Sequence, residues 1–174
     1  MYKWICKESK QKVARYIIGK EGSNPLVLFT LFPEDHSLAK WGETIKKVVK
    51  LSEALDNDGW LIINIYPIKI NTISDINYGE NMQLVYRNRD EIKELFIKYN
   101  VTTVWAAWGN EVHKNTFLWY ELMNLLKRFP NNLNWITVGK LSTDGHPVFS
   151  NKYLNISQMK SFHIKEYVNK HHLK

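Results

Sequence analysis

The chain has 174 residues, of which 44% are hydrophobic and 24% are charged, ordinary values for a globular protein with a buried core. It carries 24 lysines and arginines against 17 aspartates and glutamates, a net charge of +7. The single cysteine excludes an internal disulfide and a thiolate metal cluster, and no apolar run approaches the ~20 residues that span a bilayer. We expect one domain over residues 1–174, with a basic tail from about residue 157 and no membrane partner.

The start of the sequence, Met1-Tyr2-Lys3-Trp4, lacks the apolar core of a signal peptide, so we expect a cytoplasmic protein. Basic residues gather towards both ends of the sequence. The excess of positive charge favours contact with polyanions such as nucleic acid, although solubility alone also accounts for a charge of this size. Nucleic-acid binding is favoured if both ends lie beside the ligand-binding edge of the fold.

Two extended segments come first, over residues 15–19 and 25–32, with Gly, Ser and Asn between them. This clustering predicts a hairpin turn over residues 20–24. Residues 26–32 are continuously apolar, as in a strand that is covered on both faces, and Pro33 ends the run. A helix follows, because the next apolar residues have helical spacing. Ile45, Val48, Val49 and Leu55 fall on one stripe of this helix, together with Ser52.

Strands and helices alternate through the rest of the chain. We predict buried strands over residues 60–66, 101–108 and 135–138, helices over residues 81–99 and 115–129, and an exposed basic helix in the tail. Residues 68–79 have no clear period and predict a long loop near the ligand edge. The alternation predicts a three-layer α/β/α fold with a mostly parallel central sheet, plus the N-terminal antiparallel hairpin.

Polar residues follow four of the predicted strands. The carboxyl ends of parallel strands meet at one edge of a sheet, and open α/β sheets bind their ligands there. The four segments are residues 32–36, 64–67, 108–110 and 145–149. We therefore expect them to converge on one ligand site. Phosphate-binding loops, dinucleotide fingerprints, His-Glu-x-x-His pairs and Gly-x-Ser-x-Gly elbows are absent from the sequence, so we predict neither a cofactor nor metal ligands.

The candidate catalytic residues are carboxylates and a histidine. Glu34 and Asp35, followed by His36, can provide a general base, or they can cap the helix that follows. His146 can donate a hydrogen bond to a developing negative charge or act as an acid or base, or it can simply fix its turn. We expect the other histidines of the second half on the surface: His113, His163, His171 and His172.

Other strand-end residues are candidates for binding a substrate. The amide of Asn64 can read the polar edge of a nucleobase, or it can satisfy backbone groups. Aromatic residues can stack on a base at ~1–3 kcal/mol each, or they can fill the core. They are Phe32, Tyr66, Trp105, Trp108 and Phe149. Gly109 allows the backbone to approach a ligand closely.

These landmarks resemble those of a bacterial and phage family, domain-of-unknown-function family 1643. The matching segments are Arg15-Tyr16, Phe32-Pro33, Asn64-Ile65, residues 106–109 and residues 145–149. Phe32 stands where the family has asparagine, and Glu34-Asp35-His36 replaces a serine-containing loop. The order of the landmarks is also similar to that of the uracil-DNA glycosylase superfamily, which implies the same fold.

The second resemblance implies roles for individual residues. Asn64 would read the base edge, His146 would stabilise the departing base anion, and Asp35 or Glu34 would orient water or stabilise the sugar cation. The predicted substrate-binding set is completed by the other strand-end residues: Phe32, Pro33, His36, Tyr66, Trp108, Gly109, Asn110, Pro147 and Phe149. Two departures are that the acidic residues follow Pro33 and that Val148 occupies the position of a DNA-contacting serine.

The sequence thus predicts a protein directed at nucleobases or nucleic acid, namely DNA, with hydrolysis of an N-glycosidic bond as its chemistry. A non-catalytic nucleic-acid-binding accessory protein, of phage or defence origin, is one alternative. An enzyme that acts on a free nucleotide is another. The base and the oligomeric state are left open.

Overall fold

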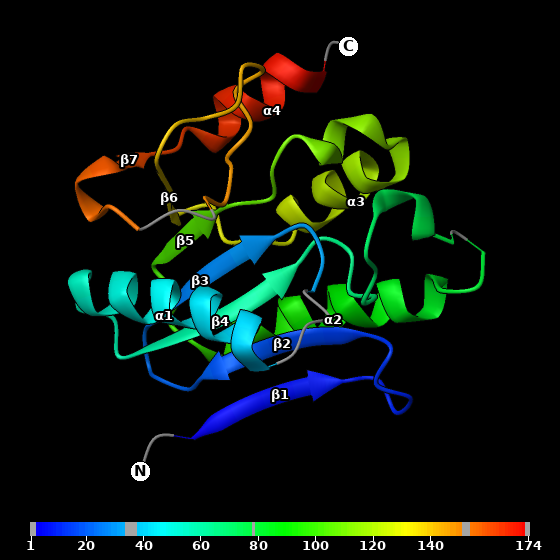
Figure 1. Cartoon of the computed structure of the whole chain (residues 1–174), viewed down its shortest axis with the longest axis horizontal. Helices are drawn as coiled ribbons and strands as arrows, with labels where there is room; N and C mark the ends of the chain where they lie inside the picture. The colour runs from blue at the N-terminus through cyan, green and yellow to red at the C-terminus, as the bar shows by residue number, and fades with distance from the viewer. Residues whose placement is uncertain (1–2, 34–37, 78, 151–153, 173–174) are drawn as a thin grey trace.

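The computed structural model describes residues 3–33, 38–77, 79–150 and 154–172 (Figure 1). Its seven strands form one sheet in the order β1-β2-β4-β3-β5-β6-β7. The strands are β1 (Trp4–Glu8), β2 (Arg15–Lys20), β3 (Pro25–Thr30), β4 (Gly59–Asn64), β5 (Thr103–Ala106), β6 (Asn134–Val138) and β7 (Met159–Ser161). The helices are α1 (Leu38–Ala54), α2 (Met82–Lys98), α3 (Thr116–Leu126) and α4 (Ile164–His172), with short 3-10 helices η1 (Ile73–Asp75), η2 (Glu111–Lys114) and η3 (Ile156–Gln158).

The centre of the sheet is parallel, as the sequence predicted. Strands β4, β3, β5 and β6 pair in parallel, so their carboxyl ends share one edge. The outer pairs, β1 with β2, β2 with β4 and β6 with β7, are antiparallel. None of the described helices is long and apolar enough to cross a membrane.

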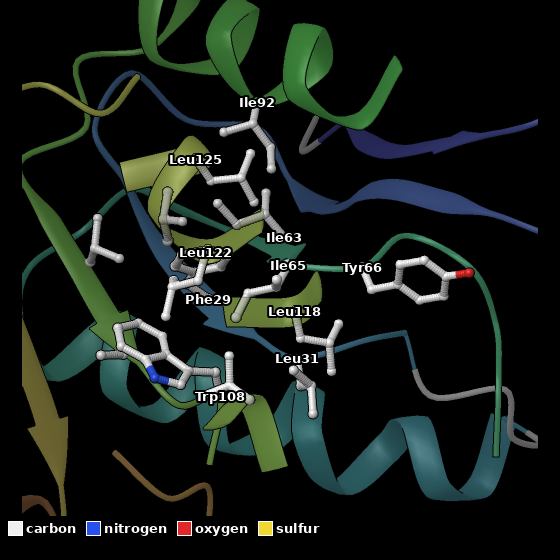
Figure 2. Packing of buried hydrophobic residues seen from close by; sticks show 14 of the residues in the cluster. Phe29, Leu31, Ile63, Ile65, Tyr66, Ile92, Trp108, Leu118, Leu122 and Leu125 are labelled. Atoms are coloured by element: carbon white, nitrogen blue, oxygen red, sulfur yellow. The ribbon is translucent and has the colours of Figure 1, made fainter. Parts of the chain in front are cut away.

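The core has two halves, one on each face of the sheet. Leu28 of β3 packs towards α1, in a cluster with Ile62 and Val48. The next residue, Phe29, points to the opposite face and packs with residues of α2 and α3 (Figure 2). Since successive strand side chains alternate between faces, strands covered on both sides must be apolar throughout. The described helices and sheet form the three layers expected from the sequence.

The predicted hairpin between residues 15–19 and 25–32 is wrong. Strand β2 pairs with β1 and β4, and β4 lies between β2 and β3. The hairpin partner of β2 is therefore β1. The sequence did not predict this strand, because its residues are mostly exposed and its apolar and polar residues do not alternate clearly. The local turn pattern cannot reveal a distant strand that inserts between its two neighbours.

The segment between β2 and β3 crosses the start of β4 instead of turning tightly. The Asp58 carboxylate accepts hydrogen bonds from the backbone N–H groups of Ser23 (2.7 Å) and Asn24 (2.8 Å). Gly22 and Gly59 let the two backbones meet, because a Cβ on Gly22 would lie 2.7 Å from the Gly59 nitrogen. The Gly, Ser and Asn residues therefore serve a crossing of two segments.

The C-terminal tail also differs from the predicted exposed helix. After η3 it adds β7 to the sheet, and α4 then packs on the face that α2 and α3 cover. Phe162 and Tyr167 are buried there. Because these aromatic side chains belong to the core, the segment lacks the polar pattern of a fully exposed helix. The predicted loop over residues 68–79 contains η1, and it buries Ile70 and Ile76 in the main core.

An ion pair between α2 and α3 should contribute strongly to stability. The Arg89 guanidinium donates two hydrogen bonds to the Glu121 carboxylate, one of them 2.8 Å long, and the Glu121 side chain is fully buried. We expect Glu121→Ala to lower the free energy of unfolding by about 3 kcal/mol, since it leaves the guanidinium of Arg89, a side chain that is 14% exposed, without its buried partner. Urea denaturation measures this change.

The matched control is Glu43→Ala, which breaks the exposed pair of Glu43 with Lys46 on α1. We expect this variant to keep the urea midpoint of the wild type, because solvent screens exposed pairs. Equal midpoint losses in the two variants would contradict the importance of the α2–α3 pair.

Candidate functional site

A cavity of about 210 Å³ opens at the carboxyl edge of the sheet, on the face that α1 covers. Its lining residues come from β2, the ends of β3 and β4, the segment after β5, α1 and the loop after β6. They are Arg15, Ile18, Thr30, Leu31, Phe32, Pro33, Thr44, Ile62, Asn64, Ala107 and Phe149. We call this cavity the α1-face pocket. Among the described residues, it brings together four of the predicted site residues, Phe32, Pro33, Asn64 and Phe149.

The chain connections explain why a cavity lies here. From β3 the chain runs through α1 to β4, which is the neighbour of β3 on one side. From β5, the neighbour of β3 on the other side, the chain runs through η2 and α3 to β6, farther away from β3. Neighbouring strands whose connections leave in opposite directions open a crevice at their carboxyl ends. The pocket lies at this topological switch point.

Asn64 ends β4 with its amide held in one orientation. Its Oδ1 atom accepts a hydrogen bond of 2.7 Å from the Thr30 hydroxyl, on the paired residue of β3. Its backbone oxygen accepts from Nδ2 of Asn88 on α2 (3.0 Å). Because Oδ1 is already engaged, the group that Asn64 can offer to a ligand is its Nδ2 donor.

Arg15 adds positive charge to the pocket wall. The side chain is buried, and its nearest guanidinium nitrogen lies 4.0 Å from Glu8, whose carboxylate also pairs with Lys69 at 3.0 Å. One carboxylate thus faces two cations. From the sequence, Arg15 was named only as part of a family-matching segment and was not placed in the site, although a strand antiparallel to β3 or β4 must begin at this edge.

Phe149 forms the aromatic wall of the pocket. Its ring packs against Trp105, with 5.4 Å between ring centroids and an interplanar angle of 36°. The Lys47 ammonium of α1 lies 5.1 Å from the Phe149 ring centroid and donates to the Ser150 carbonyl (2.7 Å). These contacts fasten the loop after β6 to α1, so the ring is held in place.

His146 lies on the other face of the sheet, where only 1% of it is exposed. Its Nδ1 atom is 2.8 Å from the Tyr167 hydroxyl, which also accepts from Nε1 of Trp108 (3.0 Å). The Ser142 hydroxyl accepts from the His146 backbone N–H (3.0 Å) and closes the turn. The structure therefore does not bring His146 together with Asn64.

The other predicted site residues that the structure describes lie outside the pocket lining. Tyr66 is buried against Phe117. Gly109 has a φ of 75°, and its backbone N–H donates to the Pro147 carbonyl (2.7 Å), while Asn110 precedes η2. Glu34, Asp35 and His36 lie outside the described residues, directly after Pro33 in the sequence.

A second group of polar side chains surrounds His146. His113 of η2 and His171 of α4 join it, and the nearest ligand nitrogens of the three lie within 4.8 Å of one another. Imidazoles in this arrangement can hold a metal ion. The expectation that His171 lies on the surface is wrong, since 5% of it is exposed, and His113 is partly buried, whereas His163 is exposed. The side chain of His172 is not described.

Burial and the neighbouring imidazoles lower the basicity of His146, the most buried member of the cluster. Burial, together with repulsion from His113 and His171, lowers the pKa of His146 from 6.5 to about 4. Burial has the opposite effect on the phenol of Tyr167, because it raises the pKa of that group. At neutral pH, therefore, His146 is an uncharged imidazole and Tyr167 an uncharged phenol.

Residues 15–148 match the family model described as "Protein of unknown function (DUF1643)". The chain belongs to this family. The matched region runs from Arg15 of the pocket to the loop that holds His146, and it leaves out β1, β7 and α4. No curated protein and no solved structure matches the chain.

The depressed pKa of His146 predicts acid sensitivity. Between about pH 6.5 and 4 the unfolded chain binds a proton at this residue and the folded chain does not, so acid favours unfolding. The stabilising contribution is complete above about pH 6.5 and is lost as the pH falls towards 4. We expect the free energy of unfolding, measured in urea with EDTA present, to fall less between pH 7 and pH 5 in His146→Gln than in the wild type. Identical pH slopes for the two proteins would contradict this assignment.

Proposed function

We propose that the α1-face pocket binds a nucleobase, either within a nucleotide or extruded from DNA. The observation that carries the proposal is the grouping of an oriented amide (Asn64), a buried cation (Arg15) and an aromatic wall (Phe149) in one cavity. A few convergent polar groups in a mostly apolar concave site are typical of small-ligand recognition.

Each group matches one property of a nucleobase ligand. The Nδ2 donor of Asn64 suits a carbonyl oxygen or an unprotonated ring nitrogen on the polar edge of a base. Arg15 suits a phosphate or the negative charge of a departing base. Phe32 and Phe149 line the pocket, and aromatic side chains are the groups against which a planar base packs.

The chemistry that we propose is hydrolysis of an N-glycosidic bond, as in uracil-DNA glycosylases, which the order of the landmarks resembles. Glu34 and Asp35 directly follow the pocket residue Pro33 in the sequence, and one of them would orient the attacking water. Arg15, in place of His146, would stabilise the base anion, because Arg15 lines the pocket and His146 does not. An extruded base would fit the concave cavity.

A free nucleotide is the second candidate substrate, and the placement of the basic segments favours it. Strand β1 lies at one edge of the sheet and β7, followed by α4, at the opposite edge, so the basic ends of the sequence are far apart (Figure 1). Within the described residues, the lysines near β1 and those near β7 therefore lie at opposite edges of the sheet, whereas a duplex binds along one continuous basic surface. A free nucleotide needs only the pocket.

Replacing Asn64 by aspartate tests recognition of the base. The introduced carboxylate would keep an acceptor for Thr30 and would lack the Nδ2 donor, so we expect the affinity for the best nucleobase ligand to fall about 10-fold or more. Isothermal titration with bases, nucleosides and nucleotides measures it. Asn131→Asp makes the same change at an exposed position before β6, and should bind as the wild type does. Equal affinities in all three proteins would refute the role of Asn64.

Asp35→Asn and Glu34→Gln test the hydrolysis. We expect the wild type to form abasic sites in oligonucleotides that contain uracil, damaged or phage-modified bases, or free base from a nucleotide, and at least one variant to slow this turnover about 100-fold or more, which is what a positioned general base contributes. Gel analysis after alkaline cleavage and chromatography of free bases measure the products. If the wild type binds a ligand but releases no base, the proposed hydrolysis is wrong and the pocket only binds nucleobases.

A further inference from the structure

Three histidines that are far apart in the sequence meet beneath the C-terminal helix. His113 comes from η2 after β5, His146 from the loop after β6, and His171 from the last turn of α4. Their ring centroids form a nearly equilateral triangle, with sides of 4.5, 4.6 and 4.6 Å. We call this group the histidine triad. It lies on the face of the sheet opposite the α1-face pocket.

The surroundings of the triad keep it largely away from water. His146 and His171 are 1% and 5% exposed, and Trp119 stacks near His113 with 4.4 Å between ring centroids. The three rings therefore place three imidazole nitrogens close together in a poorly solvated space. A shared cation would use this arrangement, since each imidazole can contribute a lone pair.

We propose that His113, His146 and His171 bind one divalent transition-metal ion, with Zn²⁺ as the ion of choice. Neutral imidazole nitrogen is a preferred ligand of Zn²⁺, and three histidines form an established donor set for it. In the described part of the chain the group contains histidines only, so the protein supplies three ligands and leaves the fourth position to water or another small donor.

The nitrogens are close to the spacing that a metal needs. Tetrahedral coordination with Zn–N distances of about 2.0–2.1 Å sets the nitrogens about 3.4 Å apart. The triad holds its nearest ligand nitrogens within 4.8 Å of one another. Metal binding would draw the nitrogens together by rotation of the imidazole rings about their side-chain bonds.

Tyr167 and Trp108 prepare His146 for this role. The indole Nε1 of Trp108 can only donate, so the Tyr167 oxygen accepts that bond and can accept a second from Nδ1–H of His146. This tautomer leaves the Nε2 lone pair of His146 for the metal. Metal-binding histidines generally donate their other N–H to such a partner, which fixes the orientation of the ring.

The metal would join the C-terminal helix to the rest of the fold. His171 belongs to α4, whereas His113 and His146 follow two central strands, so one ion links α4 to the ends of β5 and β6. Binding should therefore raise the unfolding temperature, since only the folded chain assembles the three ligands. The site is independent of the proposed function, because the pocket lies on the other face.

The test uses the full chain without an affinity tag, stripped of metal by EDTA and dialysed. We expect titration with Zn²⁺ against a chromophoric chelator to give one tight site per chain, and Co²⁺ to give the visible absorption of a tetrahedral complex. His113→Ala and His171→Ala should each weaken Zn²⁺ binding more than about 100-fold, since losing even a hydrogen-bond partner of a ligand costs about 10–100-fold. Circular dichroism checks that each variant is folded.

His163→Ala is the matched control, because His163 is exposed and precedes α4 directly. It should bind one Zn²⁺ with the affinity of the wild type. Tyr167→Phe keeps all three ligands and should weaken Zn²⁺ binding by about 10–100-fold. The proposal is overturned if folded His113→Ala or His171→Ala binds Zn²⁺ as tightly as the wild type, or if the wild type has no tight site. A failure to bind nucleobases would not affect the proposal of a metal site.

Discussion

Burial of the central strands on both faces is the constraint on which the structure depends. Side chains alternate between the faces of a strand, so two adjacent residues at a strand end belong to different layers of the molecule. Just after β5, Ala107 lines the α1-face pocket, while Trp108 packs on the other face and donates to Tyr167 beside the histidine triad. The carboxyl edge of the sheet thus offers two separate chemical environments, and a single residue step decides which of them a side chain enters.

The sequence predicted the parallel core because strands that are covered on both faces consist of continuous apolar runs, as in residues 26–32 and 60–66. It also predicted the edge at which Asn64, Phe32 and Phe149 gather. It could not assign faces, since the periodicity of a strand is hidden when nearly every residue is apolar. His146, in the loop after β6, was grouped with Asn64 because polar residues follow both predicted strands. The insertion of β4 between β2 and β3 depends on long-range pairing, which no local pattern specifies.

Both antiparallel and parallel strand pairs bring side chains to the α1-face pocket at the carboxyl edge of the sheet. Parallel register sets Thr30 beside Asn64, and their hydrogen bond orients the amide. Strand β2 runs the other way beside β4, so its first residue, Arg15, lies where β4 ends, and its backbone N–H donates to the Pro67 carbonyl (2.9 Å). A parallel strand in this position would present its last residues instead. The antiparallel edge therefore brings a cation to a site that the parallel strands supply with neutral polar groups.

The C-terminal segment gains its order mainly from side chains and only slightly from the sheet. Strand β7 pairs with β6 over three residues, which provides few hydrogen bonds for a segment that also closes an edge of the sheet. Burial of Phe162 and Tyr167 adds apolar contacts with Trp108, at 5.8 and 5.6 Å between ring centroids. The final turn of α4 contributes His171, where a helix end would otherwise fray. A metal ion held at that turn would fix the whole segment at its far end, and the strand, the aromatic contacts and the ligand would then stabilise one another.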